Sequence, residues 1–177
     1  MSKGIYAIHM SKNILSVKHL VTLYHSLIYP YFEYGLHLWG NALGKYISKL
    51  EICQRKIIRA ITCSKYNAHT SPLFASLGIL KFRDLYNYNL NMFMYDFVNY
   101  NLPNTLLTIY EYQHNVHDYG TRHSTDPKLP RVRYDIMRRS FLYEGPRTWL
   151  TLDVLIKSSK SKNIFKKQLK RKLSSFY

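Results

Sequence analysis

Apolar residues recur at three- and four-residue steps through the first third of the chain, which is the spacing of one face of an α-helix. The first stripe predicts a helix over residues 14–28 and consists of Ile14, Val17, Val21, Tyr24 and Ile28. Pro30 interrupts this stripe and can open a second short helix over residues 31–39, which Gly40 closes. A third helix is expected over residues 46–62, with inward-facing Ile47, Leu50, Ile57, Ile58 and Ile61.

Two further helices are expected before residue 101. Ser71 and Pro72 suit a helix N-cap and first position, and Gly78 suits a stop, so residues 73–77 are predicted to be helical. Residues 83–100 are apolar on nearly every side. A helix without a polar stripe is buried from several directions, and this segment is therefore the expected central helix of a bundle.

The pattern weakens beyond residue 101, where Pro103, Pro127 and Pro130 indicate irregular chain. Residues 131–134 are a candidate short strand, Gly145-Pro146 is a predicted turn, and residues 162–174 are a predicted final helix. The expected fold is mainly α: a small helical bundle over residues 1–105, then an irregular basic segment with a C-terminal helix over residues 106–177.

The net positive charge of the chain is concentrated in its C-terminal part. The chain of 177 residues has 26 Lys and Arg against 10 Asp and Glu, a net charge of +16. Residues 84–121 contain no Lys or Arg, whereas residues 122–177 contain 15 basic and 4 acidic residues. Such an excess favours a polyanionic partner, either nucleic acid or an acidic membrane surface.

The location of the protein is constrained by two further features. The most apolar run, residues 20–32, is shorter than the roughly 20 residues that a membrane helix needs, so the chain is expected to be soluble or peripheral. No membrane is counted among its expected partners. Two cysteines in a chain of this size favour a reducing, intracellular compartment, cytoplasmic or nuclear, or else have no redox role. Oligomeric state is left open.

The residues that catalysis would need are not arranged for it. No two acidic residues are closer than seven positions, so no spacing predicts a two-metal carboxylate site. Cys53 and Cys63 lack the paired spacing of a zinc site, and there is no glycine-rich phosphate loop and no nucleophile elbow. No catalytic residue, metal or cofactor is therefore expected.

Arginines alternate with aromatic residues in the basic segment, where Tyr134, Phe141, Tyr143 and Trp149 lie among them. Arginine binds phosphate with two hydrogen bonds and aromatic rings stack on bases, a combination that suits single-stranded nucleic acid. The alternatives are that the lysine-rich end is only a solvated helix and that Phe141 and Trp149 belong to the core.

Ordered sequence blocks add a resemblance that covers nearly the whole chain. They are residues 23–30 (LYHSLIYP), 34–35 (YG), 39–40 (WG), 54–59 (QRKIIR), 69–74 (HTSPLF), 77–80 (LGIL), 84–86 (DLY), 117–122 (HDYGTR), 145–149 (GPRTW) and 165–170 (FKKQLK). In this order the blocks resemble the segment that follows the palm of non-LTR (LINE-type, jockey-like) retrotransposon reverse transcriptases. Residues 149–153 (WLTLD) depart from the Trp-Asn-x-Leu-Pro that is common in that family.

The resemblance implies a thumb-like region over residues 1–105 and a post-thumb segment over residues 106–177 of an RNA-directed DNA polymerase. The catalytic aspartates of that family belong to a palm that would precede residue 1, so no polymerase activity is expected of this chain by itself. Expected partners are RNA, DNA or a hybrid duplex, and the missing palm. The alternatives are a free-standing basic RNA- or DNA-binding protein, derived from such an element, and an inactive pseudogene product.

The candidate nucleic-acid-binding residues are the basic side chains of the third helix, the irregular segment and the final helix. They are Arg55, Lys56, Arg59, Arg122, Arg131, Arg133, Arg138, Arg139, Arg147, Lys166, Lys167, Lys170 and Arg171.

Overall fold

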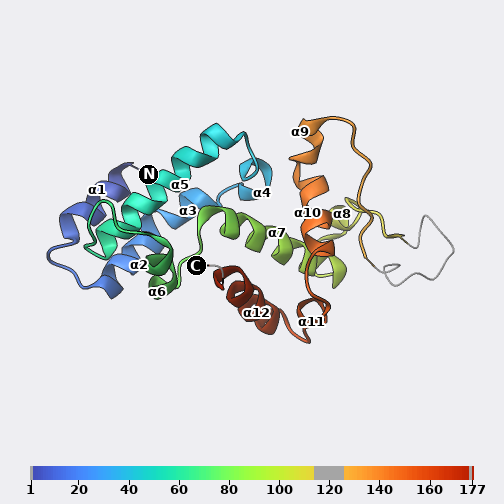
Figure 1. Ribbon diagram of the computed structural model, residues 1–177. Helices are drawn as coiled ribbons and strands as arrows, with labels where there is room; N and C mark the ends of the chain where they lie inside the picture. Colours follow the sequence, from blue (N-terminus) through green and yellow to red (C-terminus); the bar gives the residue numbers. More distant parts are fainter. Residues whose placement is uncertain (1, 114–125, 176) are drawn as a thin grey trace. The chain divides into compact units, whose positions relative to one another are not determined.

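The computed structural model describes residues 2–113, 126–175 and 177, and these residues are mainly helical (Figure 1). The expected mainly α fold is confirmed. Within the described ranges, the sole β pairing is an isolated bridge between Tyr112 and Pro127. The chain divides into two compact units, Met1–Tyr86 with Lys172–Tyr177, and Asn87–Arg171. The two boundaries of this division fall within helices, one in residues 82–98 and one in residues 162–174. The domains expected at 1–105 and 106–177 stay a prediction.

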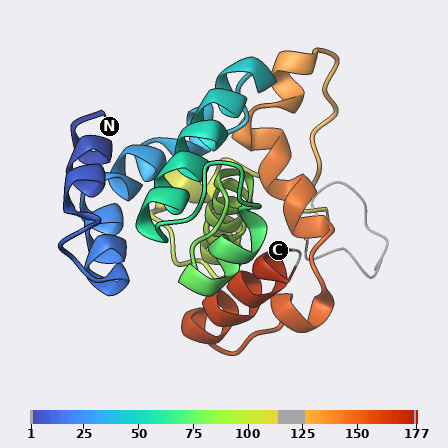
Figure 2. The ribbon, with the colours of Figure 1, turned by 60° about the vertical axis from the view of Figure 1, so that its left-hand side comes forward.

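The first unit begins with α1 (Ser2–Ser11) and α2 (Val17–Leu27), which lie side by side (Figure 2). Leu20 and Tyr24 of α2 are buried, as is Ile28 directly after it. Ile14 and Val17 were expected on the same inward face, but both are exposed. The helix begins only after Ser16, so Ile14 lies in the connection from α1 and Val17 is the first residue of α2.

The single helix expected over residues 31–39 is instead two short helices, α3 (Tyr29–Glu33) and α4 (Leu36–Trp39). Gly35 separates them with a φ of 63°, a left-handed conformation that glycine adopts without steric penalty. The indole Nε1 of Trp39 donates a hydrogen bond of 2.7 Å to the Tyr34 carbonyl and stabilises the break.

Helix α5 (Gly44–Ile61) confirms the third predicted helix. Ile47, Ile57, Ile58 and Ile61 are buried as expected, whereas Leu50 is half-buried. After α5, the Ser64 N–H donates to the Arg59 carbonyl at 3.0 Å around Cys63, which has a φ of 50°. This is the Schellman type of helix end, with cysteine where glycine is usual.

Helix α6 (Ser71–Leu77) and the left-handed Gly78 that follows it confirm the predicted short helix and its stop. The N-cap is Thr70 rather than Ser71. Helix α7 (Phe82–Val98) confirms the predicted buried helix, because Met92 and seven further apolar residues have little or no exposed surface. The seven further residues are Phe82, Leu85, Tyr86, Leu90, Met94, Tyr95 and Phe97.

The second unit contains the rest of α7 and five further helices. They are α8 (Asn104–Leu107), α9 (Asp135–Arg138), α10 (Phe141–Leu150), α11 (Val154–Lys157) and α12 (Lys162–Ser174), of which α12 belongs to this unit up to Arg171. Helix α12 confirms the predicted final helix. The core of the second unit is aromatic: Tyr95 of α7 stacks on Phe165 of α12, with ring centroids 4.5 Å apart. Phe93 and Phe97 of α7 contact Tyr110 edge-on.

Two predictions about this unit are wrong. Residues 131–134 are irregular rather than a strand. Gly145-Pro146 lies inside α10 rather than in a turn. Glycine is needed there for packing, since an added Cβ would stand 2.6 Å from the Tyr110 hydroxyl and 3.0 Å from the Met94 sulfur. No helix in the described residues is long and apolar enough to cross a membrane.

Candidate nucleic-acid interface

One side of α5 is cationic along its length. Lys45, Lys49, Lys56 and Arg59 recur at spacings of four, seven and three residues, which places them on one face of the helix. The three lysines are exposed, Arg59 is half-buried, and the buried isoleucines lie on the opposite side. At 1.5 Å per residue, this face spans about 21 Å. We call these four residues the α5 stripe.

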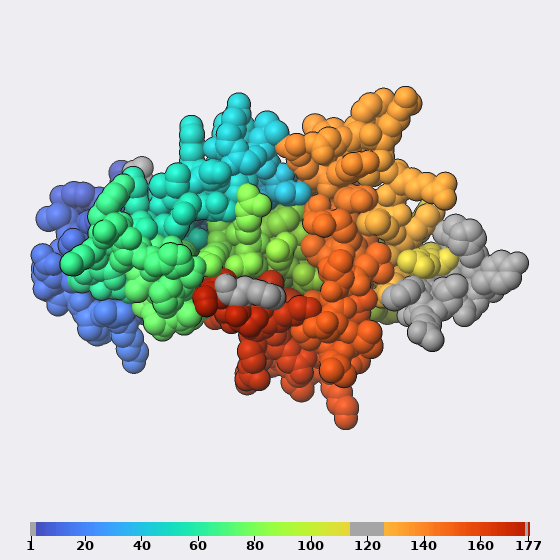
Figure 3. Space-filling view, in the orientation of Figure 1, coloured from blue at the N-terminus to red at the C-terminus, as the bar shows by residue number. Residues whose placement is uncertain are grey.

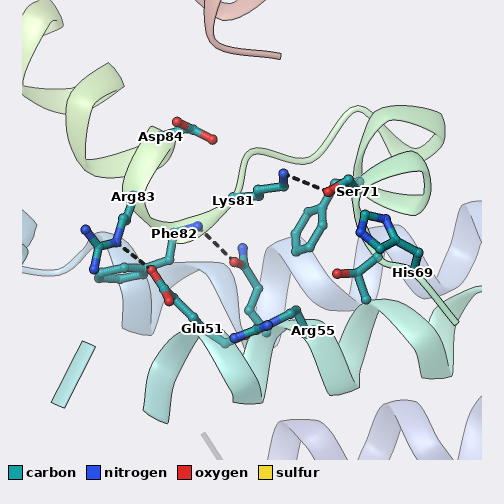
Figure 4. Close-up of a pocket in the computed structure, with 11 residues that line it drawn as sticks. Glu51, Arg55, His69, Ser71, Lys81, Phe82, Arg83 and Asp84 are labelled. Atoms are coloured by element: carbon teal, nitrogen blue, oxygen red, sulfur yellow. Dashed lines mark hydrogen bonds and ion pairs between the residues drawn. The ribbon is translucent and has the colours of Figure 1, made fainter. Parts of the chain in front are cut away.

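Lys45 and Lys49 are not among the candidate nucleic-acid-binding residues from the sequence, although the sequence pattern places Lys49 on the polar face of this helix with Lys56 and Arg59. Arg55 was singled out, but it does not belong to the α5 stripe. Its Nε donates to the Glu51 carbonyl at 3.3 Å, and it lines a separate hollow of about 380 Å³ (Figure 4). Arg55 stands only four residues before Arg59, but it lines this hollow, while Lys56 and Arg59 line another.

The hollow around Arg55 has mixed charge. The Lys81 ammonium donates to the Ser71 hydroxyl at 3.0 Å, and the Arg83 Nε donates to a Glu51 carboxylate oxygen at 2.8 Å (Figure 4). Asp84 completes it, and burial raises the pKa of that carboxyl above its ordinary value. Because carboxylates repel phosphate, this hollow is a poor nucleic-acid site.

Helix α12 carries a second cationic surface. Lys166, Lys167, Lys170 and Arg171 are exposed, while Phe165 and Leu169 are buried on the other side. The atoms of α12, dark red in Figure 3, lie at the surface of the second unit. At the start of the helix, the Lys162 ammonium donates to an Asp96 carboxylate oxygen of α7 at 2.6 Å. We call the four exposed residues the α12 surface.

The arginines between the two helices differ in what they contact. Arg131, Arg133 and Arg138 are exposed. Arg139 is held in an ion pair with Asp135, and Arg147 in one with Glu144 at 2.6 Å. Arg122 lies outside the described residues. Two of the candidate arginines, Arg139 and Arg147, are therefore engaged in ion pairs within the fold.

The aromatic residues that were candidates for base stacking are partly used in the core. Trp149 is 2 % exposed, and its Nε1 donates to an Asp126 carboxylate oxygen at 3.2 Å. Phe141 packs edge-on against Phe93 at 5.7 Å. Tyr134 is 64 % exposed and lies 6.0 Å from the Arg133 guanidinium. Of the candidate rings, Tyr134 is the best placed to meet a base.

No group of three or more His, Cys, Asp and Glu side chains in the described part of the chain could hold a metal ion.

Comparison with known proteins gives one partial similarity. Over 74 residues, 42 % of this chain, the sequence is 27 % identical to the probable RNA-directed DNA polymerase from transposon X-element of Drosophila melanogaster. The chain covers 8 % of that protein. No protein-family model and no solved structure matches. The similarity supports a relationship to a retrotransposon reverse transcriptase.

Proposed function

We propose that this chain is part of the RNA-directed DNA polymerase of a non-LTR retrotransposon, in which it binds the template–primer duplex. The observation that carries the proposal is the similarity to the polymerase of the X-element, a transposon protein. The ordered sequence blocks and the net charge of +16 support it. The part taken by this chain is to bind nucleic acid, while the catalytic carboxylates belong to the palm.

The α5 stripe suits a phosphate backbone. Its lysines lie in a row along one helix face. Glu51, the one carboxylate among residues 44–61, is paired with Arg83 in the hollow around Arg55. Lysine acts toward phosphate as a mobile point charge, so such a row binds without reading bases. The α12 surface has the same character, because residues 154–177 contain no acidic residue. Both surfaces therefore give sequence-independent affinity that depends strongly on salt.

Fluorescence anisotropy with labelled RNA–DNA hybrids of unrelated sequence tests this function. The purified chain should bind them with similar affinity, and the affinity should fall steeply between about 50 and 200 mM salt. The triple substitution Lys45→Gln, Lys49→Gln and Lys56→Gln should weaken binding to every hybrid. It should also flatten the log–log salt slope by about 0.9 for each phosphate that the variant no longer neutralises.

The matched control is Lys3→Gln, Lys18→Gln and Lys160→Gln, which removes the same charge from exposed positions elsewhere. If the two triple variants weaken binding equally, the α5 stripe contributes to affinity only through the net charge of the chain. Absence of binding by the wild-type chain at the lowest salt would refute the proposed function.

A further inference from the structure

A second hollow in the first unit is lined by basic residues from two elements. It lies between the end of α1 and the C-terminal half of α5 and has a volume of about 430 Å³. Lys12 contributes from the connection after α1, and Lys56 and Arg59 contribute from α5. Ligand pockets are commonly about 300–1,000 Å³, so this hollow has room for a small group.

The charged side chains that line this hollow are all basic. Three cationic side chains and His9 line it, and no carboxylate does so among the described residues. Arg59 is fixed in place, because its Nε donates to the Ala68 carbonyl at 3.0 Å. A fixed guanidinium loses less conformational entropy on binding an anion than a free one, which favours phosphate recognition here.

An aromatic ring borders the same hollow. Tyr66 is 82 % exposed, and the Arg59 guanidinium carbon lies 6.0 Å from the centroid of its ring. Exposed aromatic rings stack on nucleobases with little regard to sequence. A phosphate among the cations would therefore place an attached nucleoside within reach of the Tyr66 ring.

We propose that this hollow binds the terminal phosphate of a nucleic-acid strand, with the end nucleoside against Tyr66. The inference rests on the proposed function and names the part of the nucleic acid that is held. A terminal phosphate monoester carries about −1.5 to −2 at pH 7, whereas an internal phosphodiester carries a single charge. Three cations in one hollow match the greater charge of the monoester.

Cys63 provides a reporter for the test, because it is exposed and lines the hollow. Alkylation of Cys63 by uncharged iodoacetamide is followed by mass spectrometry, with and without a short 5′-phosphorylated oligonucleotide. The half-buried Cys53 is the internal reference, since burial raises the pKa of its thiol and slows its reaction. At a ligand concentration about ten times Kd, alkylation of Cys63 should slow about tenfold.

Three comparisons decide the outcome. The 5′-hydroxyl form of the oligonucleotide should protect Cys63 much less, and equal protection would overturn the assignment to a terminal phosphate. Lys12→Gln with Lys56→Gln should abolish the preference for the 5′-phosphate, whereas the charge-matched Lys3→Gln with Lys18→Gln should retain it. Equal loss in both variants would overturn the inference. Inorganic phosphate should protect less than a nucleoside monophosphate, and equal protection would remove the role of Tyr66.

The two proposals fail separately. If the wild-type chain binds no oligonucleotide but a nucleoside monophosphate protects Cys63 in a manner that depends on Lys12 and Lys56, the proposed function fails, and the hollow binds the phosphate of a free nucleotide rather than that of a strand. If hybrids bind with a steep salt slope but no ligand protects Cys63, the hollow is refuted and the proposed function stands.

Discussion

The buried side chain of Gln54 accepts a hydrogen bond of 2.9 Å from the Phe82 backbone N–H at the start of α7. Its Nε2 donates to the Tyr24 hydroxyl and to the Leu80 carbonyl, both at 3.0 Å. One polar side chain of α5 therefore joins α2 and the segment that leads into α7. Gln54 begins the QRKIIR block, so part of that block has a structural role.

Replacing Gln54 with Leu should destabilise the first unit by about 1–3 kcal/mol, because it leaves a buried N–H and a buried carbonyl without partners. Tyr24→Phe should cost less, since it removes one acceptor and leaves the Phe82 bond intact. The unfolding midpoint in urea measures both. The proposal that Gln54 holds the unit together would be contradicted by equal midpoints for wild type and Gln54→Leu.

The stability of the first unit should fall as pH rises above about 4, through the carboxyl of Asp84. Burial raises the pKa of this carboxyl, partly opposed by the Tyr177 hydroxyl, which donates to it at 2.8 Å, and by Lys81, while Glu51 raises it further. A raised folded-state pKa gives stability that is complete below the unfolded value of about 3.9 and is lost as the pH rises through the folded value.

Asp84→Asn should remove this pH dependence, because an amide does not ionise and can still accept from Tyr177. Urea midpoints measured from pH 4 to pH 7 test it. The control Asp153→Asn, at an exposed position, should keep the wild-type profile. Parallel profiles for the wild type and Asp84→Asn would show that Asp84 is not the source.

Gly145→Ala should destabilise the second unit by about 1–3 kcal/mol, the usual cost of overpacking. The new methyl group would meet the Tyr110 hydroxyl, which donates to the Phe141 carbonyl at 3.0 Å. Gly44→Ala, at the open start of α5 with nothing within 4 Å of the added Cβ, should instead be neutral or stabilising by up to about 1 kcal/mol. Thermal unfolding compares the two, and the same sign for both would contradict the packing account of Gly145.

The isolated chain should incorporate no nucleotides on a primed homopolymer template with magnesium or manganese. The acidic residues of the sequence stand at least seven positions apart, so none forms the local pair that two-metal transfer uses. Incorporation of labelled nucleotide is the measurement. Activity that Asp84→Asn or Asp96→Asn abolishes would contradict this expectation and locate a catalytic site.

Lys166→Gln, Lys167→Gln, Lys170→Gln and Arg171→Gln together should weaken nucleic-acid binding uniformly across sequences. If the chain binds about five phosphates of a duplex, the wild-type log–log salt slope is about −4 to −5, and the variant should be flatter. Phe165 and Leu169 stay in place, so helicity by circular dichroism should be unchanged. A slope equal to that of the wild type would show that the α12 surface is only a solvated helix.

The helices were predictable because their apolar residues recur at the period of one helix face or, in residues 83–100, occupy nearly every side of the segment. Residues 46–62, 83–100 and 162–174 all fold close to the expected bounds. The failures concern positions where a contact from elsewhere in the chain decides. Gly-Pro is typical of a turn, but at residue 145 the Tyr110 hydroxyl fixes the glycine inside a helix. Gln54 falls on the inward face, and only the structure shows the partners that allow its burial.

The sequence predicts which segments of the candidate interface are basic, but it predicts less well which of their side chains form ion pairs or come together in space. The ion pairs of Asp135 with Arg139 and of Glu144 with Arg147 stand at spacings of four and three within the sequence, so these arginines could have been assigned an internal role. The convergence of Lys12 with Lys56 and Arg59 could not, because 44 or more residues separate them along the chain.

The internal ion pairs have a consequence for how the protein behaves in solution. In the described residues, Glu51, Asp96, Glu111, Asp126, Asp135 and Glu144 are each paired with a Lys or Arg. Most of the ten carboxylates are therefore already neutralised, and the charge left on the surface is almost wholly of one sign. Such a surface repels itself at low ionic strength, so the folded chain should gain heat resistance from multivalent anions and retain them through purification.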